Sequence, residues 1–242
     1  MNGMVTVITP TGDRPLAFGL CQRWMLHQTW TPDQWIVVDD GIMPTKPYVP
    51  ADYIRRAPKS YDPKHTLCLN IKTALPLIRG DKILIMEDDE YYAPEYIAEM
   101  SLRLDEYDVV GICHSKYYHV PTGGFKQNLN TGHASLAETG FRTSFLTEFT
   151  DYVEKGMNGV WLDTKIWKGL GGPKKFKSLL FVDDDKPLYV GIKGLPGRAG
   201  IGIGHRASVY SRKDTPERAT LKQWIPHDYQ FYLDILSDIW LH

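Results

Sequence analysis

The 242-residue sequence predicts an α/β fold, with a Rossmann-like, mainly parallel sheet flanked by helices. Short apolar runs suited to buried strands alternate with segments whose apolar residues recur at helical spacing, which is the pattern of βαβ units. The apolar run at 83–86 leads directly into four acidic residues and so places carboxylates at the end of a buried strand. Open parallel sheets bind their ligands at that edge. Because the chain has neither an internal repeat nor a clear linker, one domain over residues 1–242 is expected.

The first 115 residues carry the clearest alternation. Apolar residues at 4–9 indicate a buried first strand, and turn residues at 10–15 follow it. The second apolar strand ends in Asp39, Asp40 and Gly41. The further elements expected in this half are strands at 34–38, 53–56, 82–86 and 108–113 and helices at 16–28, 70–78 and 94–104.

The pattern is weaker in residues 116–242. Polar residues and glycines at 115–139 indicate an ordered functional loop or a pair of irregular strands. Two apolar segments within 179–192 resemble strands joined by a solvent-facing hairpin turn that contains Asp183, Asp184 and Asp185. The helices expected in this half are one at 142–154, one that starts near Asp163, and an amphipathic terminal helix at 221–242.

The composition is that of an ordinary soluble protein, with 43% hydrophobic and 24% charged residues. The formal net charge of −1 argues against a generally basic nucleic-acid binder, although it leaves room for a local basic patch. No apolar stretch reaches the roughly 18 residues that span a bilayer, and the N-terminus lacks a signal-peptide pattern, so a cytoplasmic location is expected. Three widely spaced cysteines without a Cys-x-x-Cys pair indicate buried thiols.

The acidic run at 87–90 predicts a cation site. Carboxylates packed together repel one another and raise each other's pKa values unless a cation shares them. Hard oxygen ligands of this kind suit Mg²⁺ or Mn²⁺, usually with phosphate completing the coordination shell. A metal-bound nucleotide is therefore the first hypothesis for the ligand. The alternative is a solvated turn before a helix, since Pro94 and Glu95 have the composition of a helix start.

Three segments, in order, resemble glycosyltransferases of the GT-A fold and the family 2 type. They are residues 5–11 with Arg14, the strand end at 37–41, and Glu87-Asp88-Asp89, which differs from the family's Asp-x-Asp by one methylene. The resemblance implies that residues 1–115 bind a nucleotide-sugar donor. Residues 116–242 would then form an acceptor half with a C-terminal lid and helix. It also implies Mn²⁺ or Mg²⁺ on the diphosphate of the donor.

The same resemblance implies roles for the residues at the first two strand ends. Asp39 would accept hydrogen bonds from the uracil and the ribose. Thr9 and Pro10 would shape the base pocket, and Arg14 would approach phosphate. Taken alone, the strand end at 37–41 favours a plain strand that ends in a turn.

The metal ligands implied by the resemblance come from two parts of the chain. Asp89 would bind the metal directly, and Glu87 and Asp88 would contact ribose, water or the metal less directly. Similar transferases bring a late histidine back to the metal, which here is His205, and neutral imidazole suits Mn²⁺. The alternative for His205 is a packed or surface histidine.

The glycine-rich segment 191–204 is interpreted as a lid over the donor, because glycines let a loop close on phosphate and open again. Its spacing is not Gly-x-Gly-x-x-Gly and no βαβ unit follows it, which excludes a dinucleotide site, and no P-loop motif occurs. Lys193, Arg198 and Arg206 could neutralise the diphosphate. They could equally be solvated charges on a loop.

Asp163 is the candidate catalytic base. In the family a catalytic acid lies at a comparable place within an acidic pair, but Leu162 replaces the first acid here. The alternative is that Asp163 is an N-cap that hydrogen-bonds its own helix. Trp161 and Trp167 could line the acceptor face or pack in the core. Asp183 and its two neighbours are a rival acidic cluster, for which the solvent-facing turn is preferred over a metal site.

The sequence therefore predicts a metal-dependent, hexosyltransferase-like glycosyltransferase that moves a sugar from a UDP-sugar to a hydroxyl acceptor. The acceptor could be a glycan or, as for some stand-alone phage enzymes, a hydroxymethylated base in DNA. Polar residues of the irregular middle could recognise it, although a solvated surface is the preferred interpretation for the lysines; these residues are His114, His119, His133, Lys116, Lys126 and Arg142. The alternatives are a nucleotidyltransferase of related fold and a non-catalytic sugar-binding module, which the 7 Trp, 14 Tyr and 8 Phe would suit.

Overall fold

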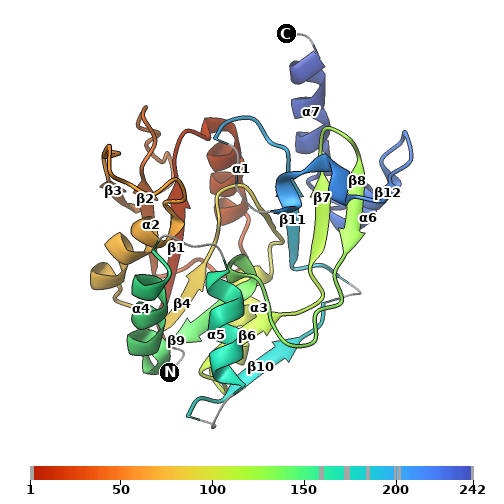
Figure 1. Ribbon diagram of the computed structural model, residues 1–242. Coiled ribbons are helices and arrows are strands. Elements are labelled where there is room, and N and C mark those ends of the chain that lie inside the picture. The colour runs from red at the N-terminus through yellow and green to blue at the C-terminus, as the bar shows by residue number, and fades with distance from the viewer. Residues whose placement is uncertain are drawn as a thin grey trace.

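The computed structural model describes residues 3–157, 161–171, 175–183, 186–198, 200 and 203–240. Its centre is a seven-stranded sheet (Figure 1). Neighbouring strands in it run parallel, except that β9 is antiparallel to both of its neighbours, β4 and β6. The expected α/β class with a mainly parallel sheet is confirmed. In spatial order the strands are β10 (Ser178–Phe181), β6 (Val109–Ile112), β9 (Thr139–Arg142), β4 (Lys82–Ile85), β1 (Val5–Thr11), β2 (Gln34–Asp39) and β3 (Asp52–Arg55).

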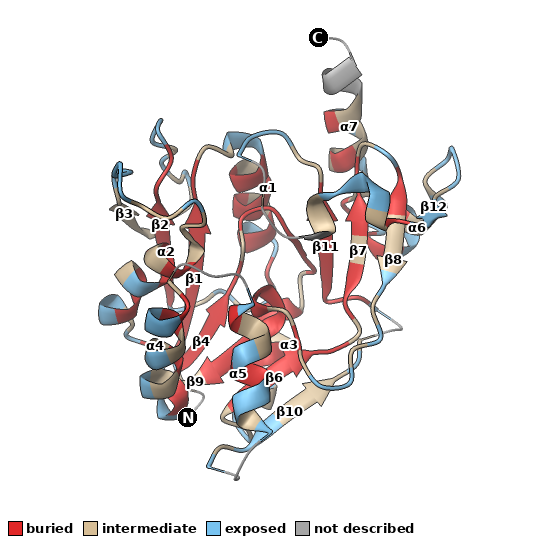
Figure 2. Cartoon of the chain, in the orientation of Figure 1, coloured by how far each residue is buried: buried red, intermediate tan, exposed pale blue. Residues whose placement is uncertain are grey.

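Helices cover both faces of this sheet, and each face has its own apolar core. Successive side chains of a strand point to opposite faces, so Val5 and Val7 pack in one core and Ile8 in the other. Figure 2 shows the central strands fully buried and the outer faces of the helices exposed. The first core holds α1 (Pro15–Leu26), α3 (Tyr96–Arg103), α6 (Ala219–Trp224) and α7 (Tyr229–Trp240), and the second holds α2 (Leu67–Ala74), α4 (Leu146–Lys155) and α5 (Leu162–Leu170).

A second, five-stranded sheet lies beside the first. It contains two segments of the region that the sequence marks as irregular, so the expectation of a pair of irregular strands there is confirmed. Within this sheet β11 runs parallel to β7 and antiparallel to β5. In spatial order its strands are β12 (Arg212–Lys213), β8 (Gly124–Gln127), β7 (Lys116–His119), β11 (Tyr189–Lys193) and β5 (Tyr91–Tyr92).

The hairpin expected within 179–192 is wrong. β10 pairs with β6 in the first sheet, whereas β11 belongs to the second sheet. Asp183 is 4% exposed and not solvent-facing, because Lys116 Nζ lies 3.2 Å from its Oδ1 and Leu188 N donates to its Oδ2 at 2.7 Å. Asp184 and Asp185 lie outside the described residues.

Two helix boundaries also differ from the expectation. The helix expected at 142–154 starts at Leu146, because Thr139–Arg142 is the strand β9 and a short 3₁₀ turn follows it. The terminal helix expected at 221–242 is divided into α6 and α7. No helix within the described residues has both the length and the apolar character needed to cross a bilayer.

The register of the parallel strands gathers their carboxyl ends at one edge of the sheet. Thr11, the last residue of β1, lies beside Asp39, the last residue of β2. Ile8 lies beside Ile85 of β4, and Met86 N donates to Ile8 O at 3.0 Å. The residues that follow β4 therefore emerge next to the end of β1, where an open sheet of this kind binds its ligands.

Candidate active site at the sheet edge

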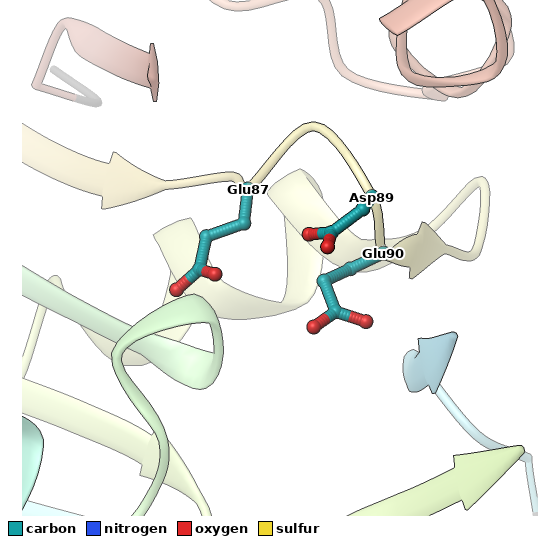
Figure 3. A group of neighbouring side chains, drawn as sticks. All are labelled: Glu87, Asp89 and Glu90. Atoms are coloured by element: carbon teal, nitrogen blue, oxygen red, sulfur yellow. The ribbon is translucent and has the colours of Figure 1, made fainter. Parts of the chain in front are cut away.

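Three carboxylates gather in the loop between β4 and β5. One oxygen atom from each of Glu87, Asp89 and Glu90 lies within 4.8 Å of the others. Figure 3 shows the three side chains projecting from the loop toward one common space. They line a cavity of about 520 Å³, which lies between the end of the parallel sheet and the second sheet. This volume falls in the range of small-molecule sites.

Asp88 points away from these three carboxylates and toward the end of β1. Thr11 Oγ1 donates to Asp88 Oδ2 at 2.7 Å, and Arg14 Nη1 donates to Asp88 Oδ1 at 2.9 Å. The same Arg14 nitrogen lies 2.9 Å from Asp89 Oδ2. The structure thus places Arg14 at the edge of the cavity, where it already compensates two carboxylates of the run.

Glu90 is paired with a buried lysine from the second sheet. Lys193 Nζ donates to Glu90 Oε1, and Ile192 N donates to Glu90 Oε2 at 2.6 Å. The side chains of Glu90 and Lys193 are 3% and 8% exposed. This pair fixes the end of β11 against the acidic loop, so both sheets contribute to the site.

The charges in the site do not balance. The four carboxylates of the run 87–90 face two paired cations, Arg14 and Lys193, which leaves two negative charges uncompensated when all four acids are ionised. Burial, and then the nearby Asp89 and Glu90, raise the pKa of Glu87 to about 8. For Asp89 burial acts in the same direction, but Arg14 and Lys193 outweigh it and lower the pKa of this carboxyl.

The residues present fit a divalent cation. Asp89 Oδ1 is buried and has no hydrogen-bond partner within the described residues, and an orphaned buried acceptor of this kind calls for a ligand. Together with Glu87 and Glu90 it offers the oxygen donors that Mg²⁺ and Mn²⁺ prefer. When all four acids are ionised, one such ion would balance their excess of two negative charges.

His205 lines the same cavity, although it lies outside the group of three carboxylates. Burial, followed by the charge of Lys193, lowers the pKa of His205 to about 4. The imidazole is therefore neutral at neutral pH, which is the form that binds metals. His205 stays a predicted ligand, placed by the structure at the same cavity as Glu87 and Asp89.

The residues predicted for the nucleotide lie at different depths. Thr9 is fully buried, and its Oγ1 accepts a hydrogen bond from Trp35 Nε1 at 2.9 Å. Asp39 is also fully buried, and its carboxylate accepts hydrogen bonds from Gly41 N, Thr45 N and Tyr53 Oη. Neither residue lines the large cavity or the smaller one of about 70 Å³ beside it. Pro10, Asp88 and Arg198 line that smaller cavity.

Residues 194–198 connect the second sheet to the loop after β1. Arg198 Nη2 donates to Asp40 Oδ1, Arg198 N donates to Asp13 O at 3.0 Å, and Arg14 Nε donates to Arg198 O at 2.7 Å. A Cβ at Gly12 would lie 2.7 Å from the backbone N of Gly41, so the close approach of these two loops requires glycine. Arg206 lines the large cavity. Residues 199, 201 and 202 of the expected lid lie outside the described residues.

Asp163 lines the large cavity from the start of α5. It is the second residue of that helix and not its N-cap, since the N-cap is Trp161. Its Oδ1 accepts a hydrogen bond from Thr164 N at 2.7 Å. The two tryptophans differ: Trp167 packs in the core and donates to Thr139 Oγ1 at 3.1 Å, whereas Trp161 lines the cavity. The role of Asp163 as base stays a prediction.

Sequence reasoning missed some residues of the cavity. Glu90 was part of the acidic run without a role of its own, and its partner Lys193 lies 103 positions away. Asn128 and Asn130 line the cavity as well, and their i, i+2 spacing after β8 is the only signal that could have indicated them. Of the residues expected to recognise an acceptor, Lys126 and His133 line the cavity, and the remaining four, His114, His119, Lys116 and Arg142, do not.

A buried acid behind the cavity wall makes folding stability depend on pH. Glu138 accepts hydrogen bonds from Ser115 Oγ at 2.6 Å and Ser135 Oγ at 2.7 Å, and no cation pairs with it within the described residues. Burial raises the pKa of Glu138 from 4.5 to about 8. The folded protein thus binds a proton that the unfolded chain has lost, so its free energy of unfolding falls as pH rises through this window.

We expect Glu138→Gln to remove the part of the pH dependence that Glu138 causes. That part changes the free energy of unfolding by at most about 1.4 kcal/mol per pH unit. Urea unfolding of the wild type and the variant at several pH values from about 5 to 8 measures it. Relative to the wild type, the variant should gain stability as pH rises. The other acids of the site titrate in both proteins and cancel in the difference. A difference that does not change with pH would contradict the prediction.

No protein-family model matches this sequence, and no curated protein matches it. Solved structures do match the fold. The structure of S. aureus TarS 1–349 in complex with UDP-GlcNAc aligns with a TM-score of 0.55 at 15% identity, over 97% of this chain and 71% of that chain. A second structure of S. aureus TarS 1–349 gives a TM-score of 0.53 at 17% identity, over 78% of this chain and 60% of that chain.

A longer S. aureus TarS structure aligns with a TM-score of 0.52 at 15% identity, over 78% of this chain. The aligned part is 36% of that TarS chain, so the present chain spans about a third of it. TarS is a GT-A-like glycosyltransferase. The present fold is therefore similar to that of a nucleotide-sugar glycosyltransferase, and at this level of identity the likeness concerns the fold alone.

Proposed function

We propose that this protein is a metal-dependent glycosyltransferase of the family 2 type. It would move a sugar, such as a hexose, from a UDP-sugar to a hydroxyl acceptor. The observation that carries the proposal is the group of Glu87, Asp89 and Glu90 at the carboxyl end of β4 in a ligand-sized cavity, in an acidic run that has two more carboxylates than paired cations. The likeness to TarS, which is known in complex with UDP-GlcNAc, supports a nucleotide-sugar donor. The proposed acceptor is a glycan or a hydroxymethylated base in DNA.

The placement of the side chains at one cavity supports the proposed division of roles. Glu87, Asp89 and His205 would hold Mn²⁺ or Mg²⁺, with Glu90 kept in place by its lysine. When bound, the cation would neutralise the diphosphate of the donor as it leaves. Arg206 lines the same cavity and would add positive charge beside the diphosphate. Asp163 would take the proton of the attacking hydroxyl, which implies inversion at the sugar carbon.

Ligand-induced stabilisation tests the donor and the cation together. A ligand that binds only the folded state raises stability by about 2.7 kcal/mol at a hundredfold excess over its Kd. For a chain of this length that is an increase in Tm of roughly 5–10 °C. We expect UDP with Mn²⁺ to give such a shift, and UDP or Mn²⁺ alone to give much less, because the uncompensated carboxylates repel the diphosphate unless the cation is present.

Differential scanning fluorimetry with UDP, UMP and uridine, each with Mn²⁺ and with EDTA, measures this. Because uridine lacks the diphosphate, it is the matched control for the contribution of the phosphates. If UDP raised the Tm equally with Mn²⁺ and with EDTA, the proposed role of the metal would be wrong. No shift with any nucleotide would remove the donor.

Product analysis separates the proposed transferase from a nucleotidyltransferase of related fold. Incubation with a UDP-sugar and Mn²⁺ should release UDP, because the bond from the sugar to the diphosphate breaks as the sugar carbon bonds to an acceptor hydroxyl or, without one, to water. Release of pyrophosphate from a nucleoside triphosphate would instead indicate nucleotidyl transfer. Binding of sugars without release of UDP would favour the non-catalytic module.

A further inference from the structure

Trp161 has two unusual properties at one position. Its side chain is 62% exposed, and its backbone is left-handed, with a φ of 79°. Residues other than glycine rarely adopt this backbone conformation. Aromatic rings of this size are usually packed against other side chains, whereas this one is largely exposed to water. Because Trp161 also lines the large cavity, its ring forms an apolar surface at a polar site. Strained residues of this kind gather where ligands are held.

Asn128 and Asn130 add hydrogen-bonding groups to the same cavity. Their backbones are fixed, since Asn128 N donates to Ser115 O at 2.9 Å and Asn130 N donates to Cys113 O at 3.1 Å. Both residues line the cavity from the irregular chain that follows β8. Within the described part of the chain neither side-chain amide has a hydrogen-bond partner. Each therefore offers a donor and an acceptor to a ligand.

We propose that Trp161, Asn128 and Asn130 form an acceptor subsite, and that its occupant is a carbohydrate ring. This inference rests on the proposed function and names its substrate class. The ring would place its apolar C–H face on the indole and its hydroxyls against the two amides. Asp163 follows Trp161 by two positions and lines the same cavity, so a hydroxyl of the stacked ring lies near the candidate base.

A flipped nucleobase would also stack on an indole, but the charge of the site favours a neutral ring. Nucleic-acid binding depends on neutralising several backbone phosphates with Lys and Arg. The formal net charge of the chain is −1. Among the described residues that line the cavity, Lys126 and Arg206 are cations without a carboxylate partner, while Asp163 and the acidic run add negative charge.

The test is a direct reading of the Trp161 ring. The protein labelled with 5-fluorotryptophan gives one ¹⁹F signal for each of its seven tryptophans, and Trp161→Phe assigns the signal of interest. The labelled protein, with UDP and Mn²⁺ present, is titrated with the methyl glycosides of glucose, galactose and N-acetylglucosamine, with thymidine, and with glycerol. We expect at least one glycoside to shift the Trp161 signal in a saturable way, and glycerol to leave it unchanged.

Two variants measure the contributions of the ring and the amide. For the glycoside that binds, Trp161→Ala should raise the Kd, read from the remaining fluorotryptophans or by calorimetry, by about tenfold or more, with Asn128→Ala producing a smaller rise. If that glycoside is also an acceptor, Trp161→Ala should raise its KM far more than the KM of the UDP-sugar. Tyr61→Ala is the matched control, since Tyr61 is an aromatic residue with 76% exposure that does not line this cavity.

The outcomes separate this inference from the proposed function. A Trp161 signal that moves with thymidine and with no glycoside would overturn the carbohydrate in favour of a nucleobase. A signal that moves with no compound, while UDP and Mn²⁺ still stabilise the protein, would overturn the subsite and leave the proposed function standing. A saturable glycoside shift without any release of UDP from UDP-sugars would support the carbohydrate site and overturn the transferase.

Discussion

Asp89→Asn is expected to lower sugar transfer by about 10²–10³-fold, an effect of the size that follows from loss of one preorganised group that stabilises a leaving anion. The substitution keeps the size of the side chain. It removes the charge of the one carboxylate of the run that has a buried oxygen without a hydrogen-bond partner among the described residues. Release of UDP from a UDP-sugar, measured across a range of Mn²⁺ concentrations, gives both the rate and the apparent affinity for the cation.

Asp228→Asn is the matched control for Asp89→Asn. Asp228 is 5% exposed, like Asp89 at 7%, and accepts a hydrogen bond from Tyr91 Oη at 3.2 Å outside the cavity. Its substitution should leave transfer within about twofold of the wild type, because its effects are confined to stability. Full activity of Asp89→Asn, or a loss that no concentration of Mn²⁺ changes while the cation still binds normally, would contradict the assigned role of Asp89.

Lys193→Met is expected to cost about 3–5 kcal/mol of stability, because it leaves the buried Glu90 without its partner. For a chain of this size the loss corresponds to a Tm lower by roughly 10 °C. Methionine retains the unbranched stem of lysine, so the change is mainly one of charge. Urea unfolding followed by circular dichroism measures it.

Two further variants identify the cause of that loss. The double variant Glu90→Gln with Lys193→Met removes both charges and should recover more than half of the lost stability. Lys186→Met breaks a surface pair instead, where Lys186 Nζ lies 2.6 Å from Glu95 Oε1 and the lysine is 64% exposed, and it should cost less than about 1 kcal/mol. If substitution of the buried and of the surface lysine lowered stability by similar amounts, burial of the pair of Glu90 and Lys193 would not be the cause of the loss.

The central strands could be predicted from the sequence because their own residues determine them. β1, β2 and β4 are short apolar runs bounded by turn residues, and all three were expected at nearly their observed bounds. β9 could not be predicted, because Thr139–Arg142 has neither a long apolar run nor clear alternation. Its place between β4 and β6 depends on close packing, in which a Cβ at Gly140 would lie 2.5 Å from Leu84 Cδ2.

The candidate site, like the fold, could be predicted from the sequence only in part. The acidic run was visible because its four acids are contiguous and follow an apolar strand. Which acid points where was not visible, since Asp88 turns to Thr11 while Asp89 and Glu90 face the cavity. That choice depends on partners supplied by the tertiary fold. The hairpin expected within 179–192 failed for a related reason, because local alternation does not show that two successive strands join different sheets.

The hydrogen bond from Arg14 to the carbonyl of Arg198 joins two residues that are 184 positions apart. A contact of such sequence separation forms late, since the chain between its ends must first be ordered. During synthesis the early strands can pair long before residues 194–198 leave the ribosome. We therefore expect the smaller cavity, which Arg14 and Arg198 line, to be the last part of the molecule to form. Binding of a ligand there would report completed folding rather than the presence of the parallel sheet.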